Sequence, residues 1–142
     1  LEKAEIAYKE RLGAGAIIYL RSAFEQIALT VGHAAGVEVY KPNGKSKPFN
    51  QVIEAVDAKC SIIPVIYSDN GYDLFIKLSD IAHGQYDEET ALRDYEHLRR
   101  LVVGVIENVK KKEKEIKNNA EIKAALDAIG FSNGGEPVEH IG

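Results

Sequence analysis

Residues 87–109 read DEETALRDYEHLRRLVVGVIENV, and this stretch decides the fold. Asp87 is a favourable N-cap residue, and two glutamates follow it in the first turn, where the helix dipole favours anions. The apolar residues behind them recur at spacings of three and four, the period of an amphipathic α-helix. They are Leu92, Tyr95, Leu98, Val102, Val105 or Ile106, and Val109. We therefore predict one long helix over residues 87–117.

The sequence on the N-terminal side of this helix predicts further helices. Residues 1–31 carry apolar positions at the same spacings, and Gly13 and Gly15 indicate either a bend or a junction of two helices. Gly32 and Gly36 are expected to end this segment. After it, Pro42-Asn43-Gly44 predicts a turn, because proline presets φ and asparagine-glycine tolerates a positive φ.

Three shorter helices are predicted around the long one. One begins near residue 48, one covers 72–82, and one covers 119–129 with Gly130 after its last turn. The apolar run at 60–67 is predicted as a short helix capped by Ser61, because Pro64 cannot occupy a central strand. The sequence therefore predicts an all-α helical bundle of four to five helices, as a single domain over 1–130 with a flexible tail over 131–142.

Composition excludes some classes of function and location. The formal net charge of −4 argues against a generally nucleic-acid-binding surface but allows a local basic patch. Cys60 is the sole cysteine, which fits a reducing compartment, and no apolar run approaches the roughly 20 residues of a membrane span. We expect a cytoplasmic protein with no membrane partner, no cofactor and no metal. The start at Leu1 and the lack of methionine suggest a fragment of a larger protein, with a partner domain elsewhere.

The residues with the most chemical character lie in 75–84. Lys77, Asp80 and His83 follow one another at spacings of three, so we expect a cation, a carboxylate and an imidazole along one side of a helix. Histidine can transfer a proton, and a nearby cation can stabilise developing negative charge. The alternative is structural, because a histidine directly before Gly84 is placed to close a helix. Arg21 and Glu25, four residues apart, are read either as an ion pair or as ligand-binding residues.

Three stretches together resemble a known family. Residues 17–25 (IIYLRSAFE), 77–84 (KLSDIAHG) and 87–91 (DEETA) resemble, in order and spacing, the HEPN superfamily (higher eukaryotes and prokaryotes nucleotide-binding). More narrowly, they resemble its small modules of unknown function attached to prokaryotic restriction and phage-defence proteins. The similarity covers about residues 14–110.

The resemblance implies a function. Ribonucleases of this family carry an arginine, four to six further residues and then a histidine, and two copies form an RNA-cleaving cleft. Here five residues separate Lys77 from His83, and lysine lacks the planar fork of arginine. The resemblance therefore implies a non-catalytic module that forms a homodimer or binds a partner domain, within a defence or restriction-type protein.

Two alternatives remain open. One is a metal-independent ribonuclease that uses His83 with Lys77 or Asp80 on an RNA substrate. The other is a nucleotide or small-anion binder that uses Arg21 and Lys77, with Glu25 beside them. All of these readings require the Arg21–Glu25 face of one helix to pack near His83.

Overall fold

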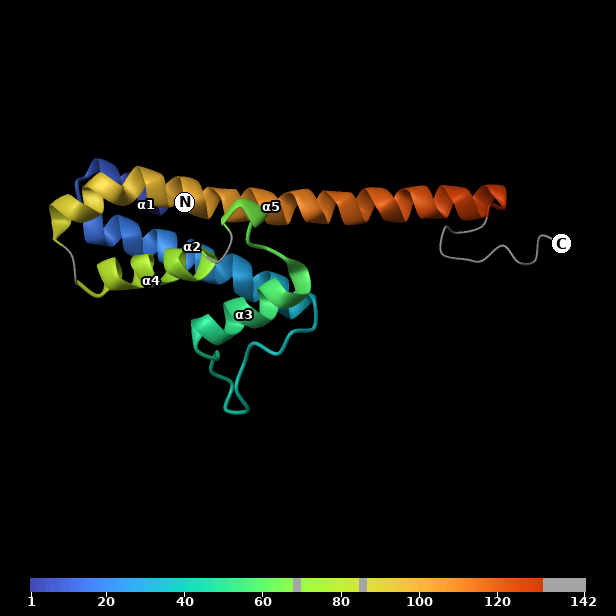
Figure 1. The fold of residues 1–142 in the computed structure, drawn as a ribbon, viewed down its shortest axis with the longest axis horizontal. Helices are drawn as coiled ribbons and strands as arrows, with labels where there is room; N and C mark the ends of the chain where they lie inside the picture. Colours follow the sequence, from blue (N-terminus) through green and yellow to red (C-terminus); the bar gives the residue numbers. More distant parts are fainter. Residues whose placement is uncertain (68–69, 85–86, 132–142) are drawn as a thin grey trace. The chain divides into compact units, whose positions relative to one another are not determined.

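A computed structural model describes residues 1–67, 70–84 and 87–131 of the chain, and these form five α-helices and one 3₁₀-helix (Figure 1). No β-strand occurs in these ranges, so the predicted all-α fold is confirmed. The predicted flexible tail lies, apart from Phe131, outside the described residues. The elements are α1 (Glu2–Lys9), α2 (Gly13–Ala34), α3 (Phe49–Cys60), η1 (Val65–Tyr67), α4 (Asn70–Ala82) and α5 (Glu88–Ile129).

The chain divides into two compact units, Leu1–Val109 and Lys110–Gly142, and the boundary falls within α5. The first unit contains every side chain of the hydrophobic core. In the second unit, the described helical residues are exposed or half-buried, and Ile116, Ile122 and Ile129 are exposed apolar residues among them. The single domain predicted over 1–130 remains a prediction.

Helix α2 is central to the first unit, because it packs against α1, α3 and α4. The ring of Phe49 lies 5.5 Å from that of Phe24 and 4.6 Å from that of Phe75, which joins α2, α3 and α4 at one point. The first part of α5 faces the same core, as its apolar spacing predicted, except that Ala91 is buried where Leu92 was expected and Leu92 is half-buried. Its buried residues are Ala91, Tyr95, Leu98, Val102, Val105 and Val109.

Residues 1–31 form two helices, which is one of the two outcomes that the glycines allowed. Arg11 adopts a left-handed φ of 60° between α1 and α2. At Gly13 a Cβ atom would lie 2.8 Å from the Cβ of Ala91, so only glycine allows this approach of α2 to α5. Glu88 then caps α2 from α5, because its Oε2 accepts a 2.6 Å hydrogen bond from the Gly13 N–H.

Several predicted boundaries were wrong, and each has a local reason. Gly32 does not end α2 but lies inside it, where a Cβ atom would be 2.6 Å from Cγ2 of Val56. Ser61 adopts a left-handed conformation that closes α3, so it caps no following helix, and only the short η1 forms after it. The break predicted between residues 117 and 119 is absent, since the sequence contains neither proline nor glycine from residue 105 to residue 129.

The N-terminus of α5 and the end of α4 agree with the sequence. The Oδ1 atom of Asp87 accepts a 2.8 Å hydrogen bond from the Thr90 N–H, and this bond lowers the pKa of Asp87. Gly84 follows α4 with a φ of 79°, a left-handed value that favours glycine.

Candidate functional site

The candidate site on α4 is built around an ion pair with α5. The Nζ atom of Lys77 lies 3.5 Å from Oδ2 of Asp94, and both side chains are partly exposed. Lys77 therefore holds α4 against α5. Asp80, one turn further along α4, is half-buried.

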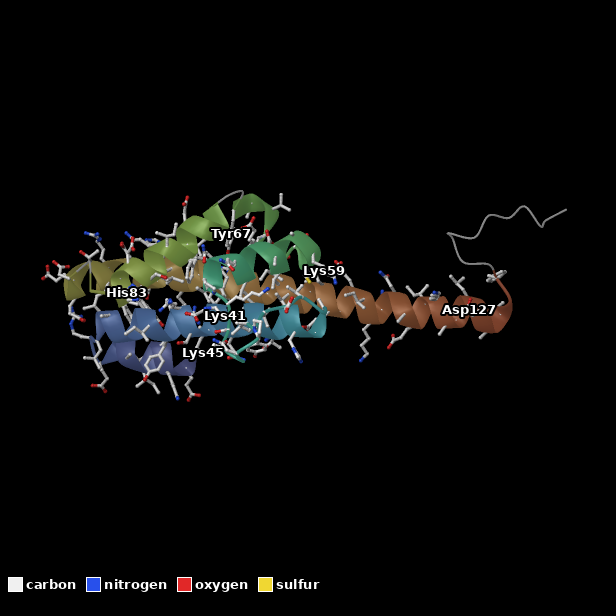
Figure 2. All side chains as sticks on the ribbon, turned by 90° about the horizontal axis from the view of Figure 1, so that it is seen from below. Lys41, Lys45, Lys59, Tyr67, His83 and Asp127 are labelled. Carbon is white, nitrogen blue, oxygen red and sulfur yellow. The ribbon has the colours of Figure 1, made fainter. Side chains whose placement is uncertain are left out.

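His83 lies directly beyond the last residue of α4, and its side chain is exposed (Figure 2). Its backbone N–H donates to the carbonyl of Ser79 at 2.9 Å, which makes it part of the helix end. An α-helix turns by about 100° and rises by about 1.5 Å per residue, so His83 is displaced from Lys77 by about 120° and 9 Å. Along α4 alone, the two side chains do not converge.

Arg21 and Glu25 form the ion pair expected from their spacing. The Nε atom of Arg21 lies 3.0 Å from Oε1 of Glu25, and the two side chains are 29% and 32% exposed. The geometry is that of a charge contact without a hydrogen bond at Nε. The guanidinium carbon of Arg21 also lies 5.6 Å from the centre of the Phe75 ring, a cation–π contact with α4.

The contacts of Arg21 and Lys77 show where these two predicted site residues lie relative to His83. Arg21 meets α4 at Phe75, which precedes His83 by eight residues, or about 12 Å of helix. Lys77 is paired across to α5, whereas Arg21 and Glu25 pair within α2. The cations predicted to bind a phosphate thus both take part in contacts that join or support helices.

Sequence reasoning missed a second feature, the turn between α3 and α4. Asn108 of α5 donates hydrogen bonds from Nδ2 to the carbonyls of Ser61 (3.0 Å) and Ile62 (2.8 Å). On the α3 side, Oδ1 of Asp57 accepts a 2.9 Å bond from the Ile63 N–H. These three bonds fix the start of the turn.

Tyr67, the last residue of η1, also binds α5. Its hydroxyl donates a 2.6 Å hydrogen bond to the carbonyl of Leu101, and a Cβ atom at Gly104 would collide with that hydroxyl. Burial raises the pKa of Tyr67, and the positive charge of nearby Arg100 partly offsets this rise. Gly104 therefore provides the room in which the tyrosine docks on α5.

Between these anchors, two apolar side chains point into solvent. Val65 is 94% exposed and Ile66 is 89% exposed. This exposure is unusual, because β-branched apolar side chains are more often buried. Since η1 is the element that carries them, we call Val65 and Ile66 the η1 apolar pair. The bonds made by Asn108 and Tyr67 could have been found only from the fold.

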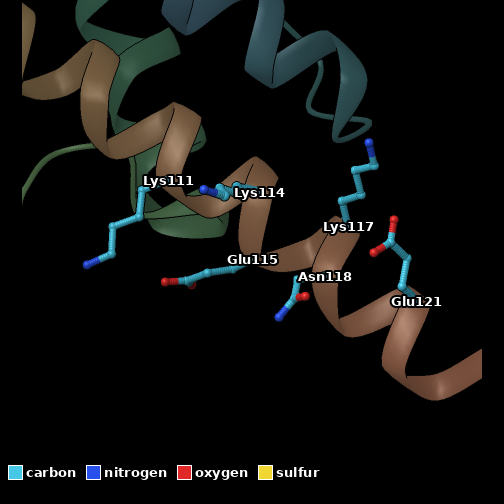
Figure 3. Close-up of a pocket in the computed structure, with 6 residues that line it drawn as sticks. All are labelled: Lys111, Lys114, Glu115, Lys117, Asn118 and Glu121. Atoms are coloured by element: carbon cyan, nitrogen blue, oxygen red, sulfur yellow. The ribbon is translucent and has the colours of Figure 1, made fainter. Parts of the chain in front are cut away.

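A pocket in the second unit is lined by polar and charged side chains (Figure 3). All of its lining residues come from one helix, so it is an open surface of α5 with mixed charges. They are Lys111, Lys114, Glu115, Lys117, Asn118 and Glu121.

Comparison of the chain with family models, with curated proteins and with solved structures finds no match. In the ranges that the structure describes, no helix is both long and apolar enough to cross a membrane. Those same ranges contain no group of three or more histidine, cysteine, aspartate or glutamate residues arranged to hold a metal ion.

Proposed function

We propose that this chain is a non-catalytic, HEPN-like helical module that assembles with a second copy of itself or with a partner domain of a larger defence or restriction-type protein. The observation that carries this proposal is the η1 apolar pair, Val65 and Ile66, held outward between the hydrogen bonds at Ser61 and Ile62 and the hydrogen bond at Tyr67. The homodimer is the form that the experiment below addresses.

The anchoring makes the η1 apolar pair suitable for binding. Single exposed apolar side chains are common on protein surfaces, but Val65 and Ile66 are adjacent and are the two most exposed large apolar side chains in the described residues. Burying a valine or an isoleucine in an interface contributes about 1.5–3 kcal/mol each. Because Asn108 and Tyr67 already order the turn, association loses little further conformational entropy. The β-branched side chains are themselves stiff at χ1, which reduces that loss again.

The contacts of the candidate catalytic residues support a non-catalytic role. The ammonium of Lys77 is paired with Asp94, so binding a phosphate there would compete with an existing contact. A lysine also lacks the two parallel donors with which arginine grips a phosphate. His83 occupies a helix end, where closing the backbone accounts for its position.

The test is light scattering coupled to gel filtration over a range of concentrations. We expect the wild-type chain to form a concentration-dependent dimer, and the double variant Val65→Ser/Ile66→Ser to be monomeric with unchanged helix content. Ile76→Ser is the matched control, because Ile76 is an exposed apolar residue of α4 outside η1. A chain that is monomeric throughout would contradict the homodimer, and a double variant that dimerises as well as the wild type would contradict the role of η1.

A further inference from the structure

A short hairpin between α2 and α3 forms a separate surface feature. Tyr40 and Ser46 form an antiparallel β-bridge, and we call residues 40–47 the basic hairpin. Its tip is the predicted turn, in which Gly44 has a φ of 85°. In Figure 1 this loop extends away from the helices of the first unit, beside α3.

The basic hairpin is ordered by its own hydrogen bonds. The N–H of Lys41 donates to the carbonyl of Lys45 at 2.6 Å, and the N–H of Gly44 donates to the carbonyl of Lys41 at 2.9 Å. The side-chain Oδ1 of Asn43 accepts a 3.0 Å bond from the Lys45 N–H. At the root, the N–H of Lys47 donates to the carbonyl of Val39, whose side chain is in the core. The hairpin is thus a preformed structure attached to the core.

The basic hairpin is positively charged, whereas the chain as a whole is negatively charged. Lys41, Lys45 and Lys47 lie within seven positions, and no aspartate or glutamate occurs between residues 39 and 53. The chain as a whole has a formal charge of −4. Lys47 makes a long 4.0 Å contact with Glu38, while in the described part of the chain Lys41 and Lys45 form no ion pair.

An exposed aromatic ring accompanies these cations. Tyr40 is 47% exposed and directly precedes Lys41. Proteins bind single-stranded nucleic acid with two kinds of side chain. Cationic side chains contact the backbone phosphates, and aromatic rings stack on the bases. An anionic membrane or an acidic peptide would need only the lysines. The ring therefore favours nucleic acid as the partner.

We propose that the basic hairpin binds single-stranded nucleic acid, with Lys41 and Lys45 on backbone phosphates and Tyr40 stacked on a base. This inference goes beyond assembly through η1 and does not depend on it. Two to three phosphate contacts give weak binding with a marked salt dependence. On single strands the slope of log K against log salt is about −0.7 per phosphate, or about −1.4 to −2 in total.

The probe is a fluorescent single-stranded oligouridylate, titrated with the full chain by anisotropy at several salt concentrations. We expect Lys41→Gln/Lys45→Gln to weaken binding by about tenfold or more at low salt and to flatten the slope by about 1.4. The matched control is Lys110→Gln/Lys111→Gln, which removes two lysines from a segment of α5 where glutamates are interleaved. We expect this control to bind as the wild type does, with melting temperatures showing that both variants fold.

The ring is tested separately. Tyr40→Phe keeps an aromatic face and should retain binding, whereas Tyr40→Ala should lose about tenfold, the typical worth of one stacked base. A duplex of matched length should bind more weakly than the single strand. Equal binding by Tyr40→Ala, or by the Lys41→Gln/Lys45→Gln variant, would overturn the proposal. So would binding to phosphatidylserine vesicles by a chain that does not bind the oligouridylate, because that outcome assigns the lysines to a membrane surface.

Discussion

Two lysine-bearing regions of the first unit differ in how their charges are used. Lys77, in the motif that first suggested catalysis, lies 3.5 Å from Asp94 and joins α4 to α5. Lys41 and Lys45, in a loop that suggested only a turn, form no ion pair in the described residues. A charged motif can thus serve the fold, while the surfaces that we propose for partners lie on the turns between helices. Substitutions can test which side chains hold the helices together and which only face solvent.

The largest effect is expected where the root of the basic hairpin meets the core. Gly32→Ala would bring a Cβ atom to 2.6 Å from Val56 and 3.0 Å from Val39. We expect it to lower the free energy of unfolding by about 2 kcal/mol, because overpacking outweighs the better helix propensity of alanine. Urea denaturation measures this.

Gly15→Ala in the same helix is the control. Its Cβ would meet only an ordinary contact with Leu12 at 3.6 Å, so we expect a gain of up to about 1 kcal/mol. Equal effects of the two substitutions would show that Gly32 is not a packing constraint.

A smaller effect is expected at a buried polar group that joins α1 to α5. The hydroxyl of Tyr95 donates to Oε2 of Glu5 at 3.0 Å, and the ring stacks on Tyr8 with centroids 4.2 Å apart. Burial, reinforced by Glu5, raises the pKa of Tyr95 to about 12. Tyr95→Phe should cost about 1 kcal/mol at neutral pH through the lost hydrogen bond.

The same pKa shift predicts a pH dependence. A raised folded-state pKa stabilises the fold fully below the unfolded value of about 10. That contribution is lost as pH rises from about 10 to about 12, because the unfolded chain ionises first. Melting temperatures across this window should fall less steeply for Tyr95→Phe than for the wild type or Tyr8→Phe. Parallel curves would show that Tyr95 does not carry this dependence.

The Lys77–Asp94 pair should contribute less again. A double-mutant cycle with Lys77→Gln and Asp94→Asn is expected to give a coupling of about 0.2–1 kcal/mol, the range for partly exposed ion pairs. A coupling near zero would remove the structural role argued for Lys77.

The smallest effect is expected at His83. His83→Ala should change stability by less than about 0.5 kcal/mol, since the side chain is exposed. The wild-type chain should not cleave RNA in excess chelator. Cleavage that disappears in His83→Ala, and persists in the surface control His97→Ala, would establish the ribonuclease alternative instead.

The sequence alone predicted those features that depend on the spacing of nearby residues. The helix end at Gly84, the Asp87 cap, the turn at Pro42-Asn43-Gly44 and the stripe of α5 except Leu92 follow from residue type and period, and the structure agrees on them. The ion pair of Arg21 with Glu25 likewise follows from a spacing of four.

Contacts between distant residues could not be predicted this way. The cap that Glu88 supplies to Gly13 joins residues 75 positions apart. The outward direction of the η1 apolar pair depends on hydrogen bonds with α5, from Asn108 to the carbonyl of Ile62 and from Tyr67 to the carbonyl of Leu101, which no local pattern encodes. The same holds for the candidate site. That Asp94 pairs with Lys77 follows only from the packing of α4 against α5.

Light scattering of the wild-type chain beside Val65→Ser/Ile66→Ser tests the central claim most directly. The account predicts a wild-type mass that rises with concentration toward twice the chain mass of 15.6 kDa, and a variant that keeps the mass of one chain at the same concentrations. Ile76→Ser should behave as the wild type. A wild-type chain that stays at the single-chain mass, or a variant that follows the wild-type curve, would contradict the assembly of two copies through η1.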